Sequence, residues 1–345
     1  LSVGSASKPA RYYDPGEFPP DTIGAVGPTQ ILVVVNARVR VFSRSGEIGF
    51  LDATLDYFFR SANHGLHTWD PQVKYDRLSG RFFITALTSG VPNYIVIAVS
   101  SGSTITDASS FTFFSFLQHE PLPAGHADGW ADFDQMGVDR RSLYIGVDIA
   151  TDYPTFEYLA SDGFVVDKAD LLAGILTVTA FRDLYPGGNR SGLDDPRGVS
   201  NDDPNSTEGY FIATDVKTYG RLILRRVTYP GGIPAISNNI FLTVPSTVQP
   251  MYAHHKGMVD DPIRLDDRLY TATIRTNKLT GVRSLWTAQN IQVNTSGVAD
   301  NFGLRDGVRW YQIGNLSGTP TLLQSGTLFD PTPDQPRFFY TPSIT

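Results

Sequence analysis

The chain contains no cysteine among its 345 residues. This absence excludes disulfide bonds, thiolate metal sites and a cysteine nucleophile, although it does not identify the cellular compartment. No apolar run approaches the roughly 20 residues that a helix needs to cross a bilayer. Even the segment 30–42 is interrupted by Asn36, Arg38 and Arg40. We therefore expect no membrane span.

Charged residues are scarce, at 18% of the chain, and their balance is acidic, with a net charge of −7. No run of Lys or Arg is longer than a pair. Nucleic acids and anionic membranes attract proteins through clustered positive charge. We therefore expect neither as a partner. The signature motifs of serine hydrolases, zinc proteases, P-loop NTPases and dinucleotide-binding oxidoreductases are also missing, so these classes lack support.

The chain is rich in residues that favour strands and turns. Hydrophobic residues make up 41% and aromatic residues 12%, with 32 Gly and 23 Pro. Aromatic and β-branched residues favour strands, whereas Gly and Pro favour tight turns. The composition predicts a folded, β-rich protein with many short strands.

A strand–turn–strand pattern recurs along the chain. Its five copies superpose on Val26, Tyr75, Val138, Val199 and Val259, which are separated by 49, 63, 61 and 60 residues. Two further strands usually follow each copy. Four strands in about 60 residues match the blade of a β-propeller. A β-sandwich is the alternative, but sandwiches do not normally repeat one signature in this way.

We therefore predict an all-β fold, a β-propeller of four-stranded blades with five complete blades. Residues 1–20 are expected to form an N-terminal extension and residues 21–345 a single propeller domain. The segment 337–345 looks like the opening of a further blade. Because an open sheet edge invites aggregation, we expect this segment to close the first sheet, or else a cleaved C-terminal part or a second chain to complete the propeller.

Several short segments resemble exported bacterial β-propeller proteins, most of them uncharacterised. The resemblance lies in "PPDTIGAVGP" (19–28), "DPQVKYDRLSGRFFIT" (70–85), "WADFDQMGVD" (130–139) and "VRWYQIGNLSGTPTLLQSGTLFDP" (308–331). It implies a propeller fold and a secreted or periplasmic location, and it implies further strands beyond the last residue. A first residue other than Met suits a chain trimmed of its signal peptide. The resemblance brings no catalytic motif with it.

Acidic and imidazole groups precede the first strand of each predicted blade, and first strands line the channel of a propeller. We expect these groups to meet at one mouth. The predicted catalytic acid–base residues are Asp70, Asp134, Asp195 and His255. Such a set suits glycan cleavage, which needs one carboxylic acid and one carboxylate. The alternative is that Asp before Pro or Gly only starts a turn.

The same mouth would also suit a hard cation such as Ca²⁺, which takes six to eight oxygen ligands. The predicted metal ligands are Asp21, Asp132, Asp194 and His254. The predicted substrate-binding residues are Trp69, Trp130, His126 and Lys256, with the indoles stacking on sugar. The alternative for the two Trp residues is packing between blades.

Two functions follow from these expectations. The first is an exported hydrolase or lyase that acts on a glycan or another extracellular polymer. The second is a non-catalytic propeller that binds a glycan or a protein and holds a structural cation. The fold alone does not distinguish them.

Overall fold

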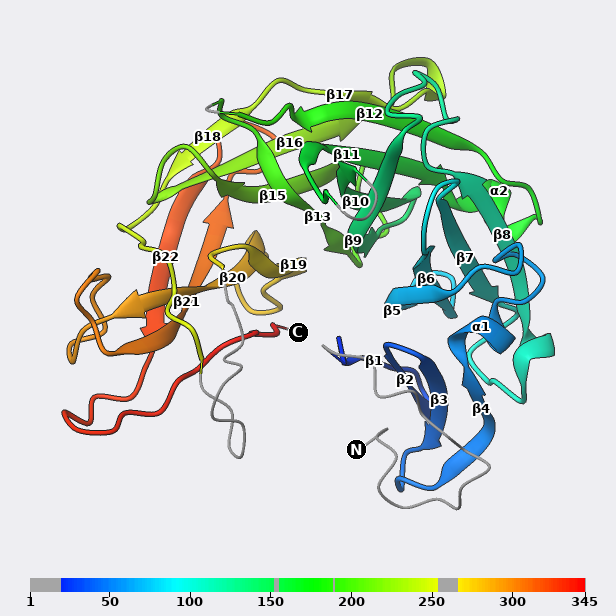
Figure 1. Cartoon of the computed structure of the whole chain (residues 1–345), viewed down its shortest axis with the longest axis horizontal. Helices are drawn as coiled ribbons and strands as arrows, with labels where there is room; N and C mark the ends of the chain where they lie inside the picture. Colours follow the sequence, from blue (N-terminus) through cyan, green and yellow to red (C-terminus); the bar gives the residue numbers. More distant parts are fainter. Residues whose placement is uncertain (1–19, 152–154, 189, 254–265, 345) are drawn as a thin grey trace. The chain divides into compact units, whose positions relative to one another are not determined.

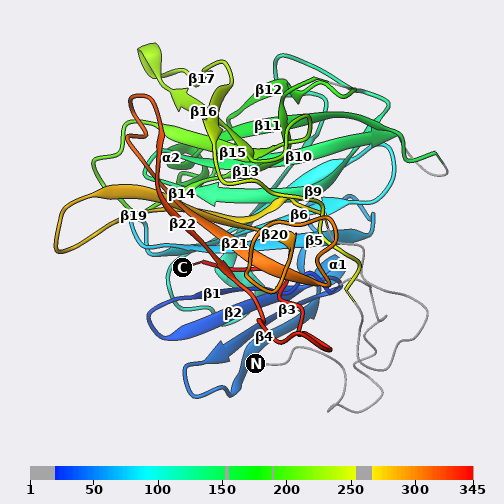
Figure 2. The ribbon, with the colours of Figure 1, turned by 90° about the vertical axis from the view of Figure 1, so that its left-hand side faces the viewer.

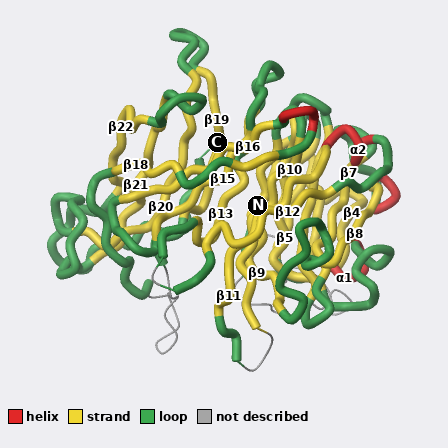
Figure 3. Tube along the Cα trace, turned by 90° about the horizontal axis from the view of Figure 1, so that it is seen from above, coloured by secondary structure: helices red, strands yellow, loops and turns green. Residues whose placement is uncertain are grey.

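The computed structural model describes residues 20–151, 155–188, 190–253 and 266–344. It divides into two compact units, residues 1–182 and 183–345. The described residues form an all-β propeller with five blades (Figure 1), which confirms the predicted fold class. Neighbouring strands pair antiparallel except for β14 and β19, which pair in parallel. Figure 3 shows how little of the chain is helical. None of its described helices is long and apolar enough to span a membrane.

The first unit carries three sheets, and in each of them neighbouring strands follow one another in sequence. The first sheet, drawn in blue in Figure 2, contains β1 (Ile23–Val26), β2 (Gln30–Val35), β3 (Arg38–Ser43) and β4 (Ile48–Thr54). The second contains β5 (Thr68–Asp76), β6 (Arg81–Thr88), β7 (Tyr94–Ser100) and β8 (Phe111–Leu117). The third contains β9 (Gly129–Val138), β10 (Ser142–Thr151), β11 (Tyr158–Asp167) and β12 (Val178–Tyr185).

Two short helices follow strands of this unit. Helix α1 (Leu55–Phe58) begins at Thr54, whose hydroxyl accepts a hydrogen bond from the backbone N–H of Tyr57. Helix α2 (Lys168–Leu172) begins at Asp167, which caps it in the same way. Ser, Thr and Asp are the usual residues at such positions.

Strand β6 shows why these sheets stack face to face. Its residues Phe82, Ile84 and Ala86 pack with the first sheet. Phe83 and Leu87 point to the opposite side and pack with the third sheet. Side chains alternate between the two faces of a strand, so a strand that is apolar on both faces is one covered on both sides. The run "RFFITAL" is therefore the sequence signature of a middle blade.

The inner strands of the three sheets, β1, β5 and β9, lie next to one another, since β5 contacts both of the others. A β-bulge interrupts β5 and β9, and β13 of the second unit has one as well. The first residue of each bulge has a left-handed backbone, with φ of 48° at Asp70, 54° at Phe133 and 48° at Asp195. Asp tolerates this conformation better than most residues. The recurring Asp-Pro of the sequence is thus a bulge signal.

The second unit carries two sheets. One contains β13 (Leu193–Gly198), β15 (Gly209–Asp215) and β16 (Arg221–Thr228), and β16 also pairs with β17 (Ala235–Ile236) and β18 (Ile240–Thr243). The other contains β14 (Ser200–Asn201), β19 (Leu269–Thr276), β20 (Arg283–Val293), β21 (Arg305–Gly314) and β22 (Thr321–Leu328).

The C-terminal segment packs against its own unit. The backbone N–H of Phe339 donates to the carbonyl of Asp306 at 3.2 Å, and that of Thr341 donates to Asn290 Oδ1 at 3.1 Å. The described residues 329–344 form no strand. The expected opening of a further blade is therefore absent from this stretch, because its backbone groups bond to the last sheet as an irregular segment.

Candidate functional site

Three of the predicted carboxylates lie together in the first unit. Asp21 precedes β1, Asp70 lies in β5 and Asp132 lies in β9. The side chain of Asp70 is hydrogen-bonded to the carboxyl groups of both Asp21 and Asp132. All three residues are half-buried. We call these residues the carboxyl cluster.

Asn36 holds two members of the carboxyl cluster in place. It lies in the turn between β2 and β3, where it is only 7% exposed. Its Nδ2 donates to Asp21 Oδ2 at 2.7 Å and lies 3.5 Å from Asp70 Oδ1. Its Oδ1 accepts from the backbone N–H of Asp70 at 2.7 Å. In the sequence, Asn36 stands out only as an interruption of an apolar run, although a buried polar residue in such a run is itself a signal.

The surroundings of Asp70 favour its protonated form. Burial, followed by the charge of Asp21, raises the pKa of Asp70 to about 6. A hydrogen bond between two carboxyl groups needs a proton on one of them. Asp70 can therefore carry and release a proton near neutral pH, as an acid catalyst must.

Asp134 lies apart from the carboxyl cluster. It is fully buried and accepts a hydrogen bond from the hydroxyl of Thr85 on β6. The bulge in β9 explains the separation, because Phe133 and Asp134 together face a single residue of β10. A bulge changes the side to which the next side chain points. In the bulge of β9, Phe133 thus corresponds to Asp70 of the β5 bulge, and Asp134 corresponds to Pro71.

Trp69 and Trp130 stack on each other. Their ring centroids lie 4.6 Å apart at an interplanar angle of 27°. Trp130 is only 5% exposed, and the ring centroid of Phe156 lies 5.8 Å from its own. These contacts favour packing between blades over sugar stacking. The indole Nε1 atoms of both residues are buried without a hydrogen-bond partner among the described residues.

His126 lies in the loop before β9, and its Nε2 is 4.0 Å from Oδ1 of the buried Asp162. Arg182 pairs with Asp162 Oδ2 at 2.8 Å. The same guanidinium donates to the backbone carbonyls of Gln118, Pro121 and Pro123, at 2.8 to 3.0 Å. Arg182 therefore fixes the loop that carries His126.

The second unit has an acidic group of its own at the start of β13. Asp195 is 5% exposed and pairs with Arg268 Nη1 at 2.9 Å. Burial, followed by the charge of Asp195, raises the pKa of Asp194 to about 7. Asp195 is thus committed to an ion pair, whereas Asp194 favours a proton. The predicted residues His254, His255 and Lys256 lie outside the described residues.

The carboxyl cluster offers only oxygen donors, as Ca²⁺ prefers. The amide of Asn36 already donates to Asp21 and accepts from the backbone N–H of Asp70. The oxygen donors of the cluster itself are its three carboxyl groups. Deprotonation of Asp70 would have to accompany binding.

No family model and no curated protein matches the chain. Solved structures similar to it include a family 43 glycoside hydrolase protein from Bacillus licheniformis, with 13% identity and a TM-score of 0.38 over 88% of this chain and 54% of that one. The chain thus spans about half the length of that protein. A thermostable family 43 glycoside hydrolase has 11% identity and a TM-score of 0.42 over 88% of this chain and 92% of that one. An α-L-arabinanase from Cellvibrio cellulosa, solved with arabinohexaose, has 11% identity and a TM-score of 0.36 over 88% of this chain and 94% of that one. These likenesses concern the fold alone.

Proposed function

We propose that the protein is a glycan hydrolase whose acid–base residues are the carboxyl cluster. The observation that carries this proposal is the hydrogen bonding of Asp70 to two other carboxyl groups at a half-buried position. Hydrolysis of a glycosidic bond needs a carboxylic acid that protonates the leaving oxygen, and a carboxylate that activates water or attacks carbon. The cluster supplies both protonation states side by side.

The roles follow from the surroundings of each group. Asp70 is the proton donor, because its pKa lies at about 6. Asp21 accepts a hydrogen bond from Asn36 and is thereby favoured as an anion. Asp21 or Asp132 then serves as the base or nucleophile. Two of these residues, Asp21 and Asp132, were predicted from the sequence as metal ligands instead.

The test is an assay of the full chain against a panel of neutral and acidic polysaccharides, with release of reducing ends as the readout. We expect Asp70→Asn, Asp21→Asn and Asp132→Asn each to lower kcat by at least 100-fold, the range of a lost acid or base. The exposed Asp334→Asn is the control and should keep full activity. Full activity in all three cluster variants would rule out this proposal.

The second candidate is a binding propeller that holds Ca²⁺ at the carboxyl cluster. The observation in its favour is the same set of three carboxyl groups, which a hard cation would neutralise. It predicts that CaCl₂ raises Tm and that Asp70→Asn abolishes the increase, with no turnover of any glycan. A Tm that does not respond to Ca²⁺ would exclude it. Export to the periplasm or the medium, suggested by the sequence resemblance, stays a prediction.

A further inference from the structure

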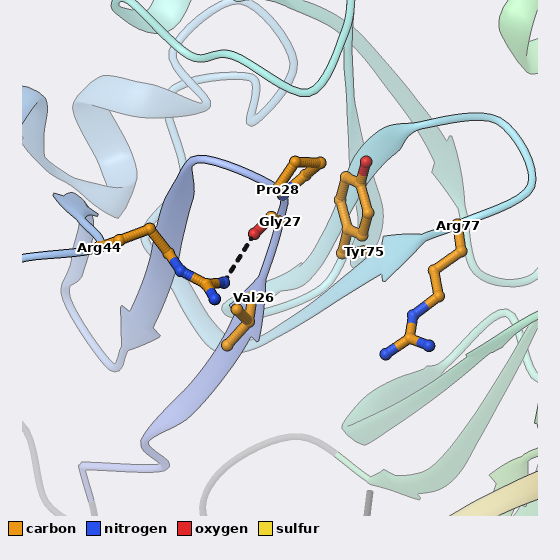
Figure 4. A pocket seen from close by; sticks show the side chains of 6 residues that line it. All are labelled: Val26, Gly27, Pro28, Arg44, Tyr75 and Arg77. Carbon is orange, nitrogen blue, oxygen red and sulfur yellow. Dashed lines mark hydrogen bonds between the residues drawn. The ribbon is translucent and has the colours of Figure 1, made fainter.

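A pocket of about 540 Å³ opens in the first unit where β1 and β5 end (Figure 4). Its lining residues are Val26, Gly27, Pro28, Arg44, Tyr75 and Arg77. Each strand passes from the carboxyl cluster to the pocket, from Asp21 to Val26 and from Asp70 to Tyr75. Five residues of extended chain span about 17 Å. The pocket is therefore a site separate from the carboxyl cluster.

Two arginines line this pocket from different sheets. Arg44 follows β3 of the first sheet, and one N–H of its guanidinium donates to the carbonyl of Gly27 at 3.1 Å. Arg77 lies in the turn between β5 and β6 of the second sheet. Figure 4 shows the two guanidinium groups on either side of Pro28 and Tyr75. A guanidinium has five N–H donors in a planar fork that matches a carboxylate, so the hydrogen bond to Gly27 leaves Arg44 with donors for a ligand.

The acidic residue beside Arg77 is already committed elsewhere. Asp76 is 2% exposed, and its Oδ2 lies 2.9 Å from Lys168 Nζ. It also accepts hydrogen bonds from the backbone N–H groups of Leu78 and Ser79. The charge of Asp76 is therefore balanced by Lys168 inside the protein.

The rest of the pocket wall is apolar. Val26 is 56% exposed, although it lies at the end of a strand. Tyr75 packs on Phe82 with their ring centroids 4.8 Å apart. Gly27 approaches the same ring so closely that a Cβ there would lie 2.6 Å from Phe82 Cζ. Apolar walls with a few convergent polar groups are typical of small-ligand sites, and aromatic and aliphatic surface suits the C–H face of a sugar.

We propose that this pocket binds an anionic saccharide, with its carboxylate held by Arg44 and Arg77 and its sugar ring packed against Pro28 and Tyr75. This site does not depend on the glycan hydrolase activity proposed above. A uronic acid is the simplest ligand with both features. A free inorganic anion shares only the charge.

The test is a titration of the ¹⁵N-labelled full chain at low ionic strength, followed by chemical shifts, with sodium glucuronate, glucose or sodium phosphate. We expect saturable binding of glucuronate, at least tenfold tighter than that of glucose or phosphate. Added NaCl should weaken it, because both arginines are exposed and salt screens exposed charges. Glucose that binds as tightly as glucuronate would overturn the proposal, and phosphate that binds as tightly would overturn the assignment to a saccharide.

Variants locate the site. Arg77→Gln and Arg44→Gln should each weaken glucuronate binding about tenfold, the effect of one charge-assisted hydrogen bond. Arg77→Lys keeps the positive charge but lacks the planar fork of N–H donors. It should therefore weaken glucuronate binding less than Arg77→Gln does. Arg140→Gln is the matched control, since exposed Arg140 follows Asp139 in the corresponding turn of the third sheet and does not line the pocket. Equal losses in Arg77→Gln and Arg140→Gln, with Tm unchanged in both, would refute the assignment.

Discussion

Lys168 Nζ lies 2.9 Å from Asp76 Oδ2, and the side chains are only 5% and 2% exposed. The lysine belongs to α2, which follows the third sheet, and the aspartate ends β5 of the second sheet. Lys168 also donates to the backbone carbonyl of Asp139. The ion pair therefore ties two sheets together at the turns that lead out of their inner strands.

Lys168→Met should destabilise the protein strongly, because it leaves the buried carboxylate of Asp76 without its counter-charge. Loss of one partner of a buried ion pair typically costs about 3–5 kcal/mol. Urea unfolding measures this change. The exposed Lys278→Met serves as control and should change the unfolding free energy by less than about 0.5 kcal/mol. A loss as small as that of the control would show that the ion pair contributes little to stability.

Asn36→Ala should raise the pKa of Asp70 above its value of about 6, since the amide of Asn36 stabilises the ionised carboxyl group. The change also removes hydrogen bonds to Asp21 and to the backbone of Asp70, at a cost of about 1–3 kcal/mol. Carboxyl ¹³C titration follows the pKa directly.

Asn63→Ala is the matched control for Asn36→Ala. Asn63 is 3% exposed and makes local hydrogen bonds to the carbonyls of Asp56 and Leu66. It should lower stability by a similar amount and leave the titration of Asp70 unchanged. Equal titration curves for Asn36→Ala and the wild type would show that Asn36 does not position the cluster.

Asp70→Asn should flatten the dependence of stability on pH. The pKa of Asp70 is raised in the folded protein, to about 6 from an ordinary 3.8. The folded state thus binds the proton more tightly than the unfolded chain, and its contribution to stability is lost as pH rises from about 4 to about 6. The wild type should lose unfolding free energy over this window, and Asp70→Asn should lose less.

Part of this pH dependence will persist in Asp70→Asn, because burial also raises the pKa values of Asp194, Asp267 and Asp306. Guanidinium unfolding at a series of pH values gives the slope. Asp334→Asn, at an exposed position, should reproduce the wild-type slope. A slope for Asp70→Asn as steep as that of the wild type would contradict the raised pKa.

Thr85→Val should lower the unfolding free energy by about 1–3 kcal/mol, because it removes the hydroxyl that donates to the buried Asp134. Asp134→Asn should cost stability as well, yet leave the activity of the folded protein unchanged, in contrast to Asp70→Asn. Urea unfolding and the polysaccharide assay separate the two effects. If Asp134→Asn were inactive but as stable as the wild type, Asp134 would be a catalytic residue.

The five-bladed fold could be predicted because each blade repeats one local arrangement. Runs such as "RFFITAL" are apolar on both faces, and the Asp-Pro at positions 70 and 195 marks the bulge that precedes them. A two-residue periodicity and a left-handed turn residue are both local properties, so they can be recognised in a single sequence without an alignment.

The carboxyl cluster was harder to predict, for a geometric reason. In the third blade Phe133 takes the left-handed position of Asp70, and this shift turns Asp134 inward. An offset of one residue reverses the side to which a strand residue points. Asn36 was missed because its role depends on contacts with β5 and with the chain before β1, which are distant in sequence. No local pattern encodes such a contact.

Arg182 holds the loop before β9 by its backbone, through the carbonyls of Gln118, Pro121 and Pro123. Every amino acid presents the same carbonyl, so these three bonds by themselves set no requirement on the side chains. Gln118 adds a requirement of its own, because its buried Nε2 also donates to the carbonyls of His126 and Gly129. The exposed side chains of Leu122 and Ala124 are where the loop can accept new residues and keep its path, as long as the guanidinium and its Asp162 partner persist.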